Sequence, residues 1–277
     1  MATSELSTEG GGYTEFSEFY KQTTGNDHED RDFHNLERPD FPRAINNNID
    51  TFQYYTADNF NDTIKPSTAQ LSVINFNIRG INCNFDNLLT YLNSLECKFD
   101  IIILTESHIQ NNAVHAENLH NKYPIEGYDM FYVESSIKFG GVIMYVKSKF
   151  KATYFHELTK TTNTHDSLYV KIDPGSSKGQ KSRKQLYIGG YYRHCLSKSD
   201  DIVKFLHVFD NDLSHRLINK NDVIIAGDFN ICLMKSTYNT DSLCFLNTII
   251  GNNYEPLIFK PTRIQYFKDS LQVKSAK

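Results

Sequence analysis

The twelve residues from Asp222 to Leu233 constrain the fold of this chain more than any other stretch. Val223 to Ala226 is a short apolar run rich in β-branched residues, which is typical of a strand covered on both faces. Gly227 interrupts the run, and Asp228 and Asn230 follow with one residue between them. In extended backbone both polar side chains point to one side. The stretch predicts a carboxylate and an amide at the carboxyl end of a buried strand, where α/β sheets bind ligands, although an ordinary Asp/Asn turn would explain the same residues.

Two earlier apolar runs also lead into polar side chains. Leu71 to Phe76 is followed by Asn77, and Phe99 to Leu104 is followed by Glu106. Both runs predict buried strands, so an amide and a second carboxylate would lie at strand ends. A charged residue after a strand is commonly just the first solvated loop residue, and this reading of Glu106 stays open.

Helical periodicity separates these strands. An apolar stripe at spacings of three and four predicts a helix after the first strand, capped by Asn84 or Asp86. A second helix is expected from about Ser199, and a third, capped by Asp241, over Ser242 to Ile250. The remaining predicted strands are Gly140 to Val146, Leu168 to Ile172 and Leu186 to Tyr191, the last leading into Tyr192, Arg193 and His194. No clear strand is predicted after Pro261.

The 277 residues are enough for one large domain or two small ones. No apolar run approaches the roughly 20 residues that span a bilayer, and no signal peptide is recognisable, so we expect a soluble, intracellular protein without membrane contacts. Five widely spaced cysteines without a Cys-x-x-Cys pair indicate neither a disulfide framework nor a zinc site, and buried free thiols are expected.

Charge is distributed unevenly along the chain. Residues 1–65 hold thirteen acidic and five basic side chains, whereas 66–277 hold twenty-four basic and twenty acidic ones. We expect residues 1–68 to be a disordered acidic tail and 69–277 to be the folded domain. The body could tolerate a polyanion, but its positive balance is far below that of dedicated nucleic-acid binders.

In order along the chain, the strand-end motifs are Asn77-x-Arg79-Gly80, Thr105-Glu106, Tyr192-Arg193, Gly227-Asp228-Phe229-Asn230 and Pro261-Thr262-Arg263. With this order and spacing, the stretch from about Leu71 to Arg263 resembles the endonuclease/exonuclease/phosphatase superfamily. It is most similar to the apurinic-type endonuclease domain of non-LTR (LINE-type) retrotransposons. The resemblance implies an α/β fold, a four-layer sandwich of two mainly antiparallel β-sheets flanked by helices.

The resemblance also implies metal-dependent hydrolysis of phosphodiesters, with Mg²⁺ or Mn²⁺ as the only cofactor and double-stranded DNA as the partner. Glu106 matches the metal ligand, and Asn77 the amide that orients metal and phosphate. Tyr192 matches a phosphate-contacting tyrosine, Asp228 the carboxylate that activates water, and Asn230 the amide that steadies the phosphoryl oxygens. Arg193 and Thr262 match positions near the substrate. A functional retroelement endonuclease would act in the nucleus.

The end of the sequence departs from the family pattern. Relatives carry an Asp-His pair after a Ser-containing strand, whereas here Asp269-Ser270 is not followed by histidine. His194 is the nearest substitute, and a poor one. The resemblance therefore implies a domain that lacks its last strand and the Asp-His pair, so that its catalytic set is incomplete. Two other functions stay open: a phosphatase or sphingomyelinase of the same superfamily, and a non-catalytic remnant that binds nucleic acid or protein. The sequence leaves the oligomeric state and the target-site preference open.

Overall fold

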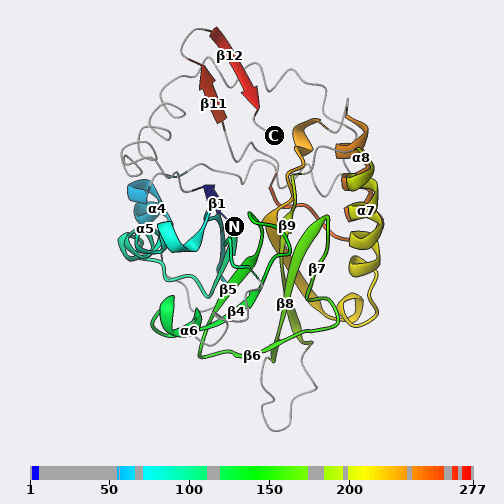
Figure 1. Cartoon of the computed structure of the whole chain (residues 1–277). Coiled ribbons are helices and arrows are strands. Elements are labelled where there is room, and N and C mark those ends of the chain that lie inside the picture. The colour runs from blue at the N-terminus through cyan, green and yellow to red at the C-terminus, as the bar shows by residue number, and fades with distance from the viewer. Residues whose placement is uncertain are drawn as a thin grey trace. The chain divides into compact units, whose positions relative to one another are not determined.

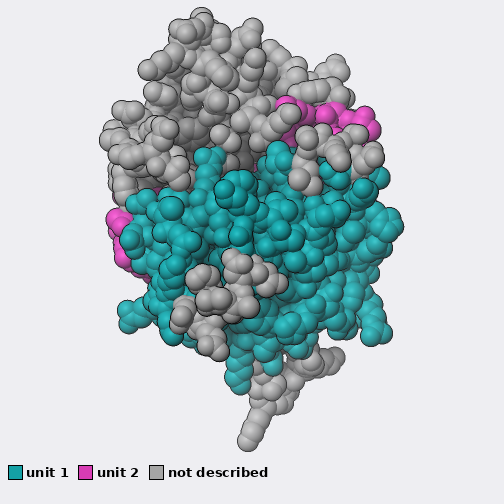
Figure 2. Space-filling view, in the orientation of Figure 1, with its two compact units in different colours: residues 1–6, 70–89, 99–230 teal, residues 7–69, 90–98, 231–277 magenta. Residues whose placement is uncertain are grey.

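The computed structural model describes residues 2–5, 55, 57–65, 71–110, 119–173, 184–195, 199–235, 239–258, 264–267 and 270–275. The chain divides into two compact units, coloured separately in Figure 2. The first unit comprises 1–6, 70–89 and 99–230, and the second comprises 7–69, 90–98 and 231–277. All predicted site residues except Thr262 belong to the first unit, which holds both large sheets.

One five-stranded sheet has the order β1-β2-β3-β5-β4. Its strands are β1 (Ala2–Glu5), β2 (Val73–Asn77), β3 (Ile101–Thr105), β5 (Val142–Lys147) and β4 (Tyr128–Val133). β1, β2 and β3 run parallel, and β5 is antiparallel to both β3 and β4. The helices of this half are α5 (Ile81–Ser94), between β2 and β3, and α6 (Leu119–Lys122). The parallel pairing places Asn77 opposite Thr105, directly before Glu106.

The second sheet has the order β10-β9-β8-β6, with β7 added to β8. Its strands are β6 (Lys151–Tyr154), β7 (Lys160–Thr161), β8 (His165–Asp173), β9 (Leu186–Arg193) and β10 (Asp222–Asp228). β9 is antiparallel to β8 and parallel to β10. The connection from β9 to β10 contains α7 (Ser199–Leu213) and the short helix η3 (Ile218–Lys220). The crossover brings Tyr192 and Asp228 opposite each other at one end of the sheet.

The inner faces of the two sheets share one apolar core. Its buried residues include Ile101, Ile103, Val142 and Met144 from the first sheet and Leu168, Val170, Ile188 and Ala226 from the second. The sheets pack tightly at Gly190, where a Cβ atom would be 3.0 Å from Val142 and 3.2 Å from Ile103. Figure 1 shows the sheets face to face, with α6 and the start of α5 outside one and α7 outside the other.

Aromatic rings fill the space between the second sheet and α7. Tyr191 contacts Phe209 at 5.2 Å between ring centroids and stacks on Phe229 at 5.7 Å. Phe205 contacts His165 at 5.4 Å. The predicted four-layer α/β sandwich is therefore confirmed. Strand pairing is mainly antiparallel in the second sheet, whereas the first sheet mixes two parallel with two antiparallel pairs.

The second unit contains α4 (Ala57–Thr63), η4 (Leu233–Lys235), α8 (Thr240–Gly251), β11 (Ile264–Phe267) and β12 (Ser270–Ser275). β11 and β12 form an antiparallel hairpin where no strand was predicted. Asn61 ties α4 to the segment after α5, because its amide donates to Ser94 O at 2.8 Å and its carbonyl accepts from Glu96 N at 2.9 Å. The expected tail thus contains β1 and α4, and the boundary at residue 68 stays a prediction.

Both predicted caps differ from the structure. Asn84 lies inside α5, which begins at Ile81, and its amide donates to Ile78 O at 2.9 Å. The side chain of Asn239, not Asp241, caps α8 by accepting from Ser242 N at 2.9 Å. The Asn239 side-chain oxygen thus reaches a free N–H of α8, whereas the Asn84 amide donates to a carbonyl before α5 and caps none of its free N–H groups.

All five cysteines are free, as predicted, but burial differs from the expectation. Only Cys97 is buried, whereas Cys83, Cys195 and Cys244 are exposed. None of the helices in the described ranges is long and apolar enough to cross a membrane.

Candidate active site

Three strand ends converge on one amide group. The Nδ2 of Asn77, at the end of β2, donates to Glu106 Oε1 at 2.9 Å and to Asp228 Oδ2 at 3.0 Å. Glu106 directly follows β3, and Asp228 ends β10 in the opposite sheet. The predicted residues Asn77, Glu106 and Asp228 therefore form one hydrogen-bonded cluster that joins the two sheets at this end.

Tyr192 joins the cluster from β9. Its hydroxyl forms a hydrogen bond with the Glu106 side chain, and the Asp228 carboxylate lies nearby. Burial, and then the negative charge of Glu106, raise the pKa of Tyr192 far above its ordinary value. The phenol therefore stays protonated at all physiological pH values and can act as a hydrogen-bond donor.

Arg193 and Asn230 lock the turn after β10 to the end of β9. The guanidinium of Arg193 donates to Phe229 O at 2.6 Å and to Asn230 O at 2.7 Å. In return, Asn230 Nδ2 donates to Arg193 O at 2.7 Å, and Asn230 N donates to Asp228 Oδ1 at 3.0 Å. Arg193 is buried, and these contacts hold the Asp228–Asn230 turn in place, while its predicted contact with substrate stays a prediction.

The site is built on strained backbone. Arg79, Glu106, His108 and Asn230 have φ angles of 49°, 53°, 56° and 50°. For residues other than glycine, this left-handed conformation costs roughly 1–2 kcal/mol each. Interstrand hydrogen bonds hold it, because Gly80 N donates to Glu106 O at 2.7 Å and His108 N donates to Gly140 O at 2.8 Å. The surrounding backbone thus fixes Glu106 before any ligand binds.

Two glycines allow the close approach of neighbouring segments. A Cβ atom on Gly227 would lie 1.9 Å from Tyr191 O on the adjacent strand. A Cβ atom on Gly141, whose φ is 93°, would lie 2.4 Å from Ser107 Oγ, next to Glu106. Both positions therefore exclude every residue with a side chain.

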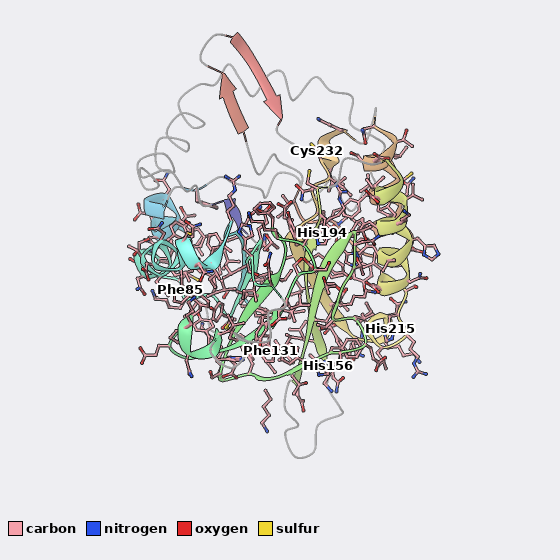
Figure 3. The ribbon with its side chains drawn as sticks, viewed as in Figure 1. Phe85, Phe131, His156, His194, His215 and Cys232 are labelled. Carbon is pink, nitrogen blue, oxygen red and sulfur yellow. The ribbon has the colours of Figure 1, made fainter. Side chains whose placement is uncertain are left out.

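A buried histidine–carboxylate pair lies next to Tyr192. His194, labelled in Figure 3, donates from Nε2 to Asp166 Oδ2 at 3.0 Å, and both side chains are fully buried. Asp166 also accepts from Gly141 N at 2.8 Å. Burial alone would raise the pKa of Asp166, but the hydrogen bonds from His194, Thr161 and Gly141 together lower it.

The His194 side chain is therefore engaged in a hydrogen bond within the protein interior. The centroid of its ring lies 5.7 Å from the centroid of the Tyr192 ring. Sequence reasoning missed its partner Asp166, although a carboxylate close before the strand predicted over Leu168 to Ile172 was a signal that could have been followed. Thr262 and Asp269 lie outside the described residues.

The donor set fits a hard divalent cation. Two half-buried carboxylates, Glu106 and Asp228, share one amide, and among the described residues no lysine or arginine forms an ion pair with either of them. Mg²⁺ is commonly held in proteins by one or two carboxylates, with water and substrate phosphate completing its shell. The described residues contain no group of three or more His, Cys, Asp and Glu side chains that could hold a metal, so here the protein would supply the two carboxylates only.

Comparison with known proteins agrees with this fold. The profile of the endonuclease/exonuclease/phosphatase family matches residues 74–265. No curated protein sequence matches the chain. Among solved structures, the AP endonuclease LMAP from Leishmania major is 14% identical, with a TM-score of 0.47 over 82% of this chain and 78% of that chain. The endonuclease domain of TRAS1, a telomere-specific non-LTR retrotransposon, is 16% identical, with a TM-score of 0.49 over 74% of this chain and 83% of that one.

Proposed function

The chain belongs to the endonuclease/exonuclease/phosphatase family, and from this membership we propose that it hydrolyses phosphodiesters as a metal-dependent endonuclease of the retroelement type that nicks double-stranded DNA. The observation that carries the proposal is the single Asn77 amide that bridges Glu106 and Asp228 across the two sheets. It brings together two carboxylates whose proximity favours a cation between or beside them. We assign this activity to the domain from 69 to 277, with 1–68 as its tail.

Glu106 is the proposed ligand of Mg²⁺ or Mn²⁺, and the Asn77 amide that donates to it would help to orient the metal and the phosphate. When bound, the cation would neutralise the charge of the phosphodiester and polarise its phosphoryl group. The strained but hydrogen-bonded conformation of Glu106 supports this role, because a ligand fixed in advance needs no ordering when metal binds.

Asp228 is the proposed general base that accepts a proton from the attacking water. Its Oδ2 accepts from Asn77 and its Oδ1 from Asn230 N, so the carboxylate is oriented from both sides. The Asn230 amide uses one N–H on Arg193 O and retains a second for a phosphoryl oxygen. The protonated Tyr192 hydroxyl and this amide would stabilise developing negative charge without adding repulsion.

Nicking of supercoiled plasmid in Mg²⁺ tests the proposal. Because the catalytic set is incomplete, we expect the wild-type chain to nick only slowly, and we expect EDTA, Glu106→Gln or Asp228→Asn to abolish the nicking that remains. Fast nicking that these variants abolish would show that another group replaces the missing histidine. Glu126→Gln is a matched control, since Glu126 is exposed and lies outside the cluster. Circular dichroism of each variant would verify that the fold is retained.

Assays with other substrates distinguish the proposed function from the other functions of the family. Hydrolysis of inositol phosphates or sphingomyelin without DNA cleavage would contradict the endonuclease proposal in favour of a phosphatase. Salt-dependent DNA binding that survives Glu106→Gln, with no cleavage of any substrate by the wild-type chain, would instead identify a non-catalytic binding protein.

A further inference from the structure

An exposed aromatic ring stands beside the candidate site. Phe139 lies in the loop between β4 and β5, and its side chain is 54% exposed. Its ring meets the His108 ring edge-to-face at 5.3 Å between centroids, and the Nζ of Lys138 lies 5.1 Å from its centroid. We call His108, Lys138 and Phe139 the aromatic rim. It begins two residues after Glu106.

The backbone of the rim is fixed to the site. His108 N donates to Gly140 O at 2.8 Å, and Ser135 N donates to Ile109 O at 3.0 Å. A Cβ atom on Gly140 would lie 2.0 Å from Ser135 Oγ and 2.4 Å from the buried Asp166 carboxylate, so the loop cannot shift inward. These hydrogen bonds fix the backbone around Phe139 to the segment His108–Ile109, which begins two residues after Glu106.

The exposed Phe139 ring contributes less to the stability of the fold than a buried ring would. Burying a phenylalanine side chain stabilises a protein by roughly 1.5–3 kcal/mol, so a half-exposed ring on a rigid loop forgoes much of that gain. A nucleic-acid base offers a flat face that would cover the ring, and the phosphates flanking the base would face the Lys138 ammonium. Inorganic phosphate and sugar phosphates lack a flat face of this kind.

We propose that the aromatic rim binds an unpaired nucleotide next to the phosphodiester held at Glu106, with the base stacked on Phe139. The inference rests on the proposed function and narrows its substrate to DNA in which a base near the cleaved bond is unstacked. In a fully paired duplex the faces of the bases are covered by their neighbours and are out of reach of a side chain.

Fluorescence anisotropy in EDTA tests the inference without any need for catalysis. The probes are a labelled single-stranded oligonucleotide and the perfectly paired duplex of the same sequence. Phe139→Leu removes the aromatic face but keeps an apolar side chain, and it should weaken single-strand binding about fivefold or more while changing duplex binding by less than about twofold. Phe139→Tyr should retain the wild-type affinities, and Val203→Ala, at another exposed apolar residue, is the surface control.

Several results would overturn the inference. These are a single-strand affinity that Phe139→Leu leaves unchanged, an equal loss for both probes, or no binding of the single strand by the wild-type chain. Loss of binding to anionic phospholipid vesicles in Phe139→Leu, with oligonucleotide binding unchanged, would identify a membrane contact instead. Hydrolysis of bis(4-nitrophenyl) phosphate, which is too small to depend on the rim, separately reports whether the proposed chemistry at Glu106 fails.

Discussion

Replacement of Arg193 distinguishes a side chain that holds the site together from one that binds substrate. Arg193 is 9% exposed, and its guanidinium donates to Phe229 O at 2.6 Å and Asn230 O at 2.7 Å. Its carbonyl accepts from the Asn230 amide, so three hydrogen bonds join two short segments. Arg193→Ala leaves both carbonyl oxygens without their charged donor.

The expected loss follows from these contacts. A hydrogen bond to a charged group contributes about 1.5–3 kcal/mol net, and two that share one donor are not additive, so we expect Arg193→Ala to lower the free energy of unfolding by about 3 kcal/mol. The guanidinium also lies 6.0 Å from the centroid of the Phe205 ring, and that contact is lost too. Arg193→Lys should recover little, because one ammonium cannot satisfy both carbonyl groups in the fork geometry.

Urea denaturation followed by circular dichroism measures the loss, with Arg216→Ala as a control at an exposed arginine. The control should stay within about 0.5 kcal/mol of the wild type. DNA binding as a function of salt completes the test, since a lost phosphate contact would reduce the slope by about one. An unfolding free energy within about 1 kcal/mol of the wild type for Arg193→Ala, together with a reduced salt slope, would refute the positioning role and support a phosphate contact.

Three further predictions concern the fold and the metal. Gly227→Ala should lower the free energy of unfolding by about 3 kcal/mol or more in urea, because its Cβ would lie 1.9 Å from Tyr191 O, whereas Gly251→Ala, with open space around its Cβ, should change it little. The lowered pKa of Asp166 stabilises the fold above the ordinary carboxyl pKa, and this stabilisation is lost as acid protonates the carboxylate, so Asp166→Asn should be less stable at neutral pH and its stability should depend less on pH below about 4. Millimolar Mg²⁺ should raise the melting temperature of the wild-type chain, and Glu106→Gln should abolish that shift; an equal shift in both would place the cation elsewhere.

The strands that carry the site were predictable because their sequences are simple. The apolar runs before Asn77, Glu106 and Asp228 are short and rich in β-branched residues, and each occurs as a strand in the structure. β2 and β3 are buried throughout, whereas only Ala226 is buried in the edge strand β10, so the prediction that this strand is covered on both faces was wrong. Chain order and the preference for ligands at carboxyl strand ends then indicated that these polar residues belong together. Two edge strands were missed for different reasons. β4 lacks the alternation that marks a half-buried strand, and β6 alternates but is only four residues long.

The left-handed residues could not be predicted from the sequence. Glutamate and arginine have no local preference for positive φ, and even histidine and asparagine, which are enriched there, adopt it in only a minority of cases. At Glu106 and His108 the conformation is held by Gly80 N and Gly140 O, which come from segments about 26 and 32 residues away in the chain. Such contacts exist only once β2, β3 and β5 have paired, so no local pattern records them.

The side chains of Tyr192, Arg193 and His194 point alternately to the two faces of the second sheet and therefore contact different groups. Pleating turns Tyr192 and His194 to the inner face of the second sheet, where one meets Glu106 and the other Asp166. It turns Arg193 outward, over Phe205 and toward the backbone of the turn after β10. Substrate contacts were predicted for Tyr192 and Arg193, and His194 was offered only as a poor substitute for the missing histidine. The twofold period of the strand places Tyr192 and His194 on one face and Arg193 on the other, and the two substrate contacts stay predictions. A deletion of one residue in β9 would exchange the two faces, and it would therefore disrupt the site more than any single substitution within it.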